Sequence, residues 1–263
     1  MAVHYQVDRD VAVITLSRPD RFNSVSAELA SGLISAIDRA GEEARAAVLT
    51  GSGKAFCAGA DLSDLMNEYE TGGPDLSRVL AERFNPMATA LHQARVPTIA
   101  AVNGVAAGAG LGLALVCDIR IMSSETYFLS AFLGLGLIPD TGSTWLLVRH
   151  LGLARALEFT TNNRRMPASE AEALGLVRSV SPDRVLTDAT ALAQILAQGP
   201  TGAYVANRKI LYATTSIGFL DALEEERSVQ GVLGVTADHL EGMRAFLEKR
   251  PAKFGASPEQ AAD

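Results

Sequence analysis

Cysteine and tryptophan are scarce in this chain, which has two cysteines and one tryptophan among its 263 residues. Cys57 and Cys117 stand far apart, and neither belongs to a cluster with the spacing of metal ligands. The histidines share no such spacing either; they are His4, His92, His150 and His239. We therefore expect no disulfide framework and no metal site, and each histidine is more typical of a surface or core residue than of a catalyst.

Basic residues are also in deficit. Lysine and arginine number 23 against 30 aspartates and glutamates, so the formal net charge is −7 at pH 7. Proteins that bind nucleic acid are usually basic, which argues against a nucleic-acid partner. The deficit does not exclude an anionic small molecule, because a few well-placed arginines or lysines can bind one locally.

No basic stretch followed by an apolar run is found at residues 1–8, so we expect no signal peptide and a cytoplasmic protein. One uncharged run, Val96–Cys117, is long enough to be tested as a membrane span. Pro97, Asn103 and repeated glycines make it a poor spanning helix, since loop backbone cannot be left exposed to lipid. A buried strand, a loop and a buried helix explain the run better, and no membrane partner is expected.

Hydrophobic residues make up 48% of the chain, enough for a sizeable core. Strand and helix patterns alternate to about residue 180, which predicts an α/β core over residues 1–197. Only helical patterns follow, so residues 198–263 are expected to form an extra layer or an oligomerisation element. The expected strands are 5–8, 11–16, 46–50, 98–102, 119–122 and 176–180. The expected helices are 26–39 with Ser26 as N-cap, 76–94, 107–116, 184–197, 203–214, 219–233 and 237–248.

Two loops rich in glycine and alanine, Lys54–Leu62 and Ala101–Gly112, each lead into an apolar segment with a helical pattern. Where a strand ends and a helix begins, free backbone N–H groups point at one spot. Small side chains let a ligand oxygen approach that backbone closely. Together the two loops could supply two N–H donors to one oxyanion, as the chemistry of a carbonyl group requires.

Other glycine-rich or nucleophile motifs are absent from the sequence. Gly51–Ala55 lacks the spacing of a phosphate loop and the Ser or Thr that follows its lysine. Gly108–Gly112 does not have the spacing of a dinucleotide-binding loop. No G-x-S-x-G sequence is present, so a hydrolase triad has no evident nucleophile.

Several motifs occur in an order that resembles one family. They are Ala55–Leu62, Ala101–Gly104, Cys117–Ile119, Gly134–Pro139 and Ala173–Val177. Together they resemble the crotonase (enoyl-CoA hydratase/isomerase) superfamily over nearly the whole chain. The resemblance implies an α/β fold, a crotonase-like spiral of β-β-α units with a helical C-terminal oligomerisation region. It also implies a homotrimer or a dimer of trimers that acts on an acyl-CoA thioester, with coenzyme A as part of the substrate and no further cofactor.

The same resemblance assigns roles within the two loops. It implies that the backbone N–H groups of Ala60 and Ala109 hold the thioester oxygen; the family often has glycine at the second position, but only the N–H is used. Hydratases of the family use two glutamates, and aligned by motif their positions are Gly112 and Phe132 here. Neither residue can move a proton, so both acids that hydration would use are missing.

Asp140, directly after Pro139, offers a different acid. A carboxylate in this place is similar to the isomerase branch, which includes Δ3,Δ2-enoyl-CoA isomerases and the ring-epoxide or oxepin isomerases of phenylacetyl-CoA breakdown. The segment Pro139–Trp145 looks most like the latter. Moving a double bond needs one base that takes a proton and returns it, and the apolar neighbours of Asp140 would raise its pKa into a useful range. The alternative role is an N-cap or Asx-turn before a helix that begins at Ser143.

For the anionic part of coenzyme A, the resemblance points to Arg21 and Lys253; Lys253 could reach a neighbouring subunit, and both could equally be ordinary surface charges. The other substrate-binding candidates are Phe22, Ala58, Asp61, Leu62 and Phe132. Asp61 is expected to cap the helix after the first loop rather than to catalyse, and Asp118 is expected to be structural.

We therefore interpret the chain as an acyl-CoA isomerase. It would move a double bond, or open or rearrange a ring epoxide, through an enolate held in an oxyanion hole, with Asp140 as the proton shuttle. Two alternatives stay open at this point. One is an enoyl-CoA hydratase that uses Asp140 and a second acid, and the other is a subunit that binds CoA thioesters without catalysis.

Overall fold

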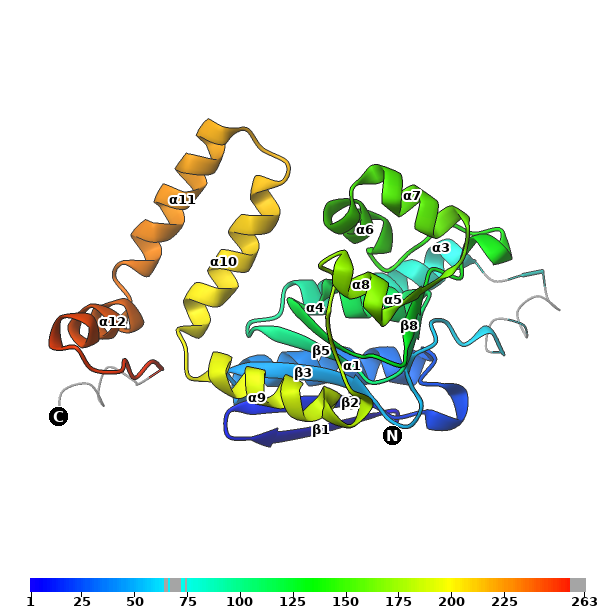
Figure 1. The fold of residues 1–263 in the computed structure, drawn as a ribbon, viewed down its shortest axis with the longest axis horizontal. Coiled ribbons are helices and arrows are strands. Elements are labelled where there is room, and N and C mark those ends of the chain that lie inside the picture. Colours follow the sequence, from blue (N-terminus) through cyan, green and yellow to red (C-terminus); the bar gives the residue numbers. More distant parts are fainter. Residues whose placement is uncertain (64–65, 67–71, 74, 256–263) are drawn as a thin grey trace.

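The computed structural model describes residues 1–63, 66, 72–73 and 75–255. Its core holds two sheets covered by helices (Figure 1). The larger sheet has the strand order β1 (Val3–Asp8), β2 (Val11–Leu16), β3 (Ala46–Gly51), β5 (Thr98–Val102), β7 (Ile119–Ser123) and β10 (Arg178–Val180). The smaller sheet has the order β4 (Ala55–Cys57), β6 (Val105–Ala107), β8 (Tyr127–Leu129) and β9 (Arg165–Pro167). Only β1 and β9 pair antiparallel with their neighbours; the other pairs in these two sheets are parallel.

The chain builds both sheets by repeating one unit. In the pairs β3–β4, β5–β6 and β7–β8, the first strand joins the larger sheet and the second joins the smaller one. A helical segment then returns the chain to the larger sheet, as α5 (Ala109–Val116) does between β6 and β7. The spiral of β-β-α units predicted from the sequence is confirmed.

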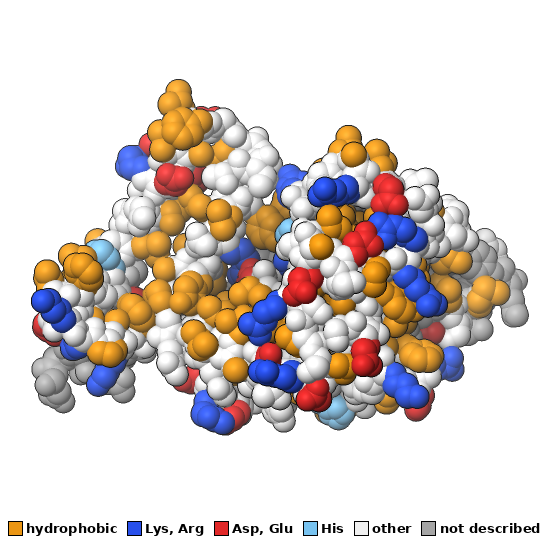
Figure 2. Space-filling view, in the orientation of Figure 1, with side chains coloured by type: hydrophobic (Ala, Val, Ile, Leu, Met, Phe, Trp, Pro, Cys, Tyr) orange, Lys and Arg blue, Asp and Glu red, His pale blue; other side chains and the backbone are white. Residues whose placement is uncertain are grey.

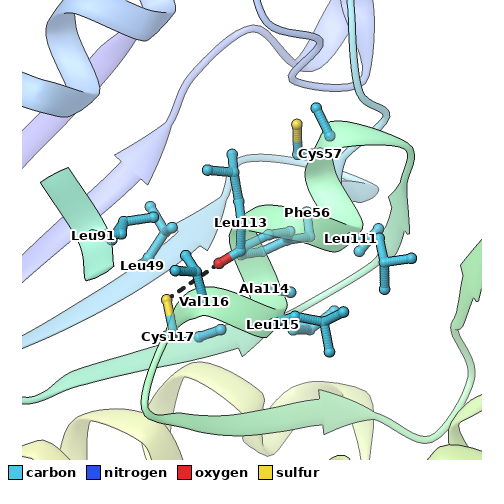
Figure 3. Close-up of a cluster of buried hydrophobic side chains, with 14 of the residues drawn as sticks. Leu49, Phe56, Cys57, Leu91, Leu111, Leu113, Ala114, Leu115, Val116 and Cys117 are labelled. Carbon is cyan, nitrogen blue, oxygen red and sulfur yellow. Dashed lines mark hydrogen bonds between the residues drawn. The ribbon is translucent and has the colours of Figure 1, made fainter. Parts of the chain in front are cut away.

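The core lies on both faces of the larger sheet. Helix α1 (Ala27–Glu43) covers one face together with α4 (Asn85–His92) and α5, and α9 (Val185–Ala197) covers the other. As predicted, Ser26 is the N-cap of α1, since its side chain accepts a hydrogen bond from the Leu29 N–H. All residues of α5 are buried, and Figure 3 shows their side chains packed against residues of β3, β4 and α4.

Both cysteines belong to this core. Cys57 and Cys117 carry free thiols and are buried, and the Cys117 thiol donates to the Leu113 carbonyl at 3.4 Å (Figure 3). Burial raises the pKa of each thiol to about 12. Neither is therefore a thiolate at neutral pH, which fits packing rather than chemistry.

The structure differs from the sequence-based assignment at several boundaries. The three-residue strands β4, β6, β8 and β9 were not predicted, because alternation cannot be recognised over so few residues. The helix expected from position 107 begins at Ala109, since 105–107 form β6. The helix expected over 76–94 divides into α3 (Leu76–Val79), a π-helical turn η2 (Leu80–Phe84) and α4. The turn precedes Pro86, which has no N–H to continue an ordinary helical ladder.

Three helices at the C-terminal end extend away from the sheets: α10 (Thr201–Thr214), α11 (Phe219–Leu233) and α12 (Ala237–Glu248) (Figure 1). Hydrophobic side chains are exposed along them (Figure 2), including Phe219, Leu220, Val232, Phe246 and Leu247. The helical pattern predicted for this region is confirmed, whereas the division at residue 197 and the role in trimerisation stay predictions. Within the described part of the chain, no helix is long and apolar enough to cross a bilayer.

A buried ion pair connects α10 to the sheet. The Arg208 guanidinium donates to the Asp118 carboxylate at 2.9 Å and to the carbonyls of Ala94 and Val96. Asp118 also accepts from the Thr98 N–H at 2.8 Å, so its carboxylate joins β5 to α10. The predicted structural role of Asp118 fits this arrangement.

Replacing Arg208 by Met should therefore destabilise the protein. Side-chain exposure of Arg208 is 6% and that of Asp118 is 20%, so the variant leaves a largely buried carboxylate without its partner. We expect the free energy of unfolding to fall by about 3 kcal/mol, measured by urea denaturation. As a control, Arg227→Met removes an exposed pair with Glu224 and should leave stability almost unchanged. Equal losses in the two variants would contradict a docking role for Arg208.

Candidate active site

A cavity of about 470 Å³ lies where the two small-residue loops meet. Its walls comprise residues 58–60 and 62 of the first loop, 108 and 109 of the second, 76, 79, 80, 84 and 85 of the segment from α3 to α4, and 131, 132, 135 and 137–142. The lining is mostly apolar, and Asp140 is the one ionisable side chain among these described residues. A pocket with this composition suits a substrate whose reacting part is uncharged.

The first loop is held by hydrogen bonds on both sides of Ala60. The Asp61 N–H donates to the Val25 carbonyl at 3.2 Å, and the Val25 N–H donates to the Gly59 carbonyl at 2.7 Å. The Ala58 N–H donates to the Phe22 carbonyl at 3.0 Å. Among the hydrogen bonds between described residues, none uses the Ala60 N–H. That donor is left available beside the cavity.

The second loop ends at the first turn of α5. Gly108 is the N-cap, with φ 53°, and Ala109 is the first helical residue. N–H groups in the first turn have no partner within a helix, and the helix dipole makes this end positive. Gly59 brings the two loops together, because a methyl group added to it would lie 3.3 Å from the Ala109 nitrogen and 2.9 Å from the Ala107 carbonyl oxygen. Ala60 and Ala109 therefore line the same cavity, where their two loops are in contact at Gly59.

Asp140 lies on the wall of this cavity. Burial raises the pKa of its carboxyl group, while a hydrogen bond from the Thr141 hydroxyl at 2.7 Å acts in the opposite direction. The carboxylate does not cap α6 (Ser143–Leu151), because the cap residue is Gly142 and the Ser143 N–H donates to the Asp140 backbone carbonyl at 2.8 Å. Thr141 has φ 53°, an unfavourable value for a β-branched residue, and such strain is found at functional sites.

The two positions at which the resemblance places hydratase glutamates hold no acid, and one of them, Gly112, has little room for a side chain. A methyl group on Gly112 would lie 2.7 Å from the Thr141 carbonyl oxygen and 2.9 Å from the Ser143 hydroxyl oxygen. The turn that carries Asp140 is thus packed directly on α5, where only glycine fits. Phe132 is buried and its ring forms part of the cavity wall. The packing role of Gly112 was missed from the sequence, although a glycine inside an apolar helix is the kind of signal that indicates close approach.

The structure brings some of the other predicted residues to the cavity and leaves others away from it. Ala58, Leu62 and Phe132 line it. Arg21 and Phe22 are exposed beside the first loop, at the end of the turn η1 (Pro19–Arg21). Lys253 follows α12, which lies at the far end of the molecule from the α3 side of the cavity (Figure 1). Within one chain Lys253 therefore does not reach this cavity.

Asp61 is buried and is not part of the cavity lining. Its carboxylate accepts from Arg18 at 2.8 Å and from the Ser63 N–H at 3.2 Å. The bond to Ser63 matches the capping role predicted for Asp61, although much of the following segment lies outside the described residues. Arg18 was not singled out in the sequence, because its contact with Asp61 joins positions far apart in the chain and appears in no local pattern.

Known proteins resemble this chain over most of its length. The family model described as enoyl-CoA hydratase/isomerase matches residues 6–257. A relative from Rhodobacter capsulatus, named "Probable enoyl-CoA hydratase", is 42% identical and covers 96% of this chain and 97% of its own length. The 1,2-epoxyphenylacetyl-CoA isomerase of Escherichia coli is 40% identical, covering 94% and 96% respectively.

A solved structure has the same fold. The crystal structure of an enoyl-CoA hydratase from Polaromonas sp. matches with a TM-score of 0.90 at 30% identity, covering 96% of this chain and 99% of that one. The match extends over both sheets and the C-terminal helices, so it is not limited to a shared motif. The chain belongs to the enoyl-CoA hydratase/isomerase family, the crotonase superfamily, whose members act on acyl-CoA thioesters.

Proposed function

We propose that the protein is an acyl-CoA isomerase that moves a double bond, or opens or rearranges a ring epoxide, in a CoA thioester. The observation that carries the proposal is the composition of the cavity. Asp140 is its one ionisable group among the described lining residues, and Ala60 and Ala109 line the same cavity. One carboxylate and two oxyanion donors are what a proton shuttle next to a thioester requires.

The chemistry follows from these groups. The thioester oxygen accepts hydrogen bonds from Ala60 and Ala109, which makes the hydrogens on the adjacent carbon more acidic. Asp140 removes one of them, and the negative charge moves onto the thioester oxygen as an enolate. The carboxylic acid then returns the same proton to a more distant carbon, and the double bond moves into conjugation. Each N–H donor would stabilise the transition state by about 2.7–4 kcal/mol, by analogy with removal of such donors elsewhere.

Hydratase activity is the second candidate, because the relative from Rhodobacter capsulatus bears that name. Hydration needs one group to activate water and another to protonate carbon. Gly112 and Phe132 supply neither, and the close contact of Gly112 with Thr141 leaves no space for a glutamate. These contacts favour isomerisation over hydration. A role as a binding subunit without catalysis is disfavoured by Asp140, whose ionisable side chain lies in an otherwise apolar wall.

We further propose that the chain acts as a homotrimer or a dimer of trimers. The apolar side chains exposed on α10–α12 are of the kind that an interface between subunits would bury. Such an assembly would allow Lys253 to reach the cavity of a neighbouring subunit, where it would bind the anionic part of coenzyme A. Arg21, exposed beside the first loop, would contribute from the same chain.

The proposal is tested by offering a 3-enoyl-CoA and crotonyl-CoA to the protein side by side. We expect the 3-enoyl-CoA to give a conjugated 2-enoyl product of unchanged mass, followed by absorbance and mass spectrometry. We expect no gain of water on crotonyl-CoA. A ring-epoxide acyl-CoA is the next substrate to try. Hydration of crotonyl-CoA without isomerisation of the 3-enoyl-CoA would contradict the proposal.

The pH dependence of isomerisation should report on Asp140. Only its carboxylate form accepts a proton, so kcat/KM should fall as the pH drops through the pKa of Asp140. Burial raises that pKa above the ordinary value of 3.8, so the fall in kcat/KM should occur at a higher pH than for an ordinary aspartate. Thr141→Val removes the hydrogen bond that favours the carboxylate and should move this fall to a still higher pH. A fall that moves to lower pH in this variant would show that another group controls it.

A further inference from the structure

We propose that Arg18 and Asp61 form a positioning pair that fixes the Ala60 N–H in the oxyanion hole and neutralises the charge beside it. The inference rests on the donor role of Ala60 in the proposed function. Neither side chain lines the cavity, so the pair acts through the backbone and through its net charge rather than by contact with the substrate. It therefore sets how strongly the thioester oxygen is polarised.

Asp61 follows Ala60 directly in the chain, and its carboxylate is anchored from two directions. The Arg18 guanidinium donates to one carboxylate oxygen at 2.8 Å. The other oxygen accepts from the N–H of Ser63 at 3.2 Å and from its hydroxyl at 2.5 Å. Side-chain exposure is 6% for Asp61 and 22% for Arg18, so little water competes for these bonds. The backbone on the C-terminal side of Ala60 is thereby fixed.

Arg18 also holds the segment that brackets Ala60 from the other side. Its second amino group donates to the Ser24 carbonyl at 2.6 Å. The next residue, Val25, forms the two backbone hydrogen bonds that enclose Ala60. One guanidinium thus links the two segments that pair at the Val25–Ala60 bridge. A rotation of the Ala60 peptide would have to break bonds on each side of it.

Charge gives the pair a second effect. Burial alone would raise the pKa of Asp61, but the hydrogen bond from Ser63 and the charge of Arg18 outweigh it and lower the pKa to about 2. Asp61 is therefore ionised at neutral pH, next to a group that must stabilise a developing negative charge. Arg18 cancels the negative charge of the Asp61 carboxylate. Without Arg18, the loop would lose one of its anchors. The unpaired carboxylate would also repel the enolate.

The pair predicts an order of effects among four variants. Arg18→Met leaves an unpaired buried carboxylate and should reduce polarisation most. Asp61→Asn removes the charge and retains a side chain that can accept from Ser63, so it should have a smaller effect. The double variant should recover part of what Arg18→Met loses, and Arg18→Lys should retain part of the wild-type behaviour. A merely structural role would not predict that removing a second residue improves function.

The test is the absorbance of a bound push–pull thioester, 4-dimethylaminocinnamoyl-CoA, whose band shifts to the red when its carbonyl oxygen is polarised. We expect a red shift in the wild type, a shift of less than about half of that in Arg18→Met, and partial recovery in the double variant, with Kd changed by less than about threefold. The kcat for isomerisation should fall in the same order, by up to about 10²-fold. Glu43→Gln, in an exposed pair with Arg39, is the matched control and should leave the shift unchanged.

The outcomes separate this inference from the proposed function. A wild-type red shift that is lost in Arg18→Met supports the pair even if no isomerisation is found. An unchanged shift in both single variants, each binding the probe, would overturn it. Absence of a shift in the bound wild type would overturn both the donor role of Ala60 and the pair. If Arg18→Met fails to fold, Asp61→Asn and Arg18→Lys carry the same comparison.

Discussion

Replacing Asp140 by Asn is expected to lower kcat for isomerisation by about 10²–10⁴-fold, the usual contribution of general acid–base catalysis. Asn has nearly the same shape but cannot accept the proton. The proposed oxyanion donors, the N–H groups of Ala60 and Ala109, are backbone groups in other segments and should stay in place. The Kd for an unreactive acyl-CoA thioester should therefore change little. Steady-state rates on a 3-enoyl-CoA and calorimetric binding measure the two quantities on the same preparations.

The same variant should not be less stable than the wild type. Because burial raises the pKa of Asp140, the folded state binds a proton on this group more tightly than the unfolded chain does. The ionised carboxylate thus disfavours folding above its folded-state pKa, and that cost disappears as the pH falls below it. Asn removes the cost, so the Tm at pH 7 should be equal or higher. If Asp140→Asn keeps its isomerase activity, another residue must be the base.

The second large effect is expected at Gly112. Replacing it by Ala places a methyl group 2.7 Å from the Thr141 carbonyl oxygen, a backbone atom that can yield only if the turn moves. The turn carries Asp140, and a displacement of about 1 Å can cost about 10²-fold in rate. We expect kcat to fall by this amount while the red shift of a bound push–pull thioester is retained, because the methyl group meets the turn after Pro139 and not the backbone at the start of α5, where the proposed donor Ala109 lies.

Gly202→Ala is the matched control for this substitution. Gly202 lies within α10, and a methyl group added there meets no atom within 4 Å. Its activity should equal that of the wild type, with stability unchanged or slightly higher because Ala favours helix. Gly112→Glu should also lose isomerase activity without gaining hydratase activity. Normal isomerisation by Gly112→Ala, or hydration by Gly112→Glu, would contradict the proposed link between Gly112 and the Asp140 turn.

Features that depend on local pattern were predictable from the sequence. The strands β2, β3 and β5 have enough apolar residues to be recognised, and so do the helices after residue 184. The two loops were recognised because small residues at a strand-to-helix junction let a ligand oxygen approach free backbone N–H groups. Ala60, Ala109 and Asp140, which belong to three separate segments, line one cavity, while their catalytic roles stay predictions.

The features that escaped prediction depend on tertiary contact. Arg18 reaches Asp61 across a long stretch of chain, and nothing in its neighbours indicates that pairing. The restriction at Gly112 arises only when the turn after Pro139 packs on α5. The position of Lys253 depends on where α12 extends, which a helical pattern does not specify. In each case the deciding contact joins segments that are distant in sequence.

The central claim is that a single carboxylate takes a proton from one carbon and returns it to another. It is tested most directly with a 3-enoyl-CoA carrying deuterium on the carbon next to the thioester, converted in a single turnover in ordinary water. The claim predicts a 2-enoyl product in which part of the deuterium has moved to the distal carbon, and loss of this transfer in Asp140→Asn. A product whose distal carbon has gained only solvent hydrogen in that first turnover, or a product that has gained water, would contradict it.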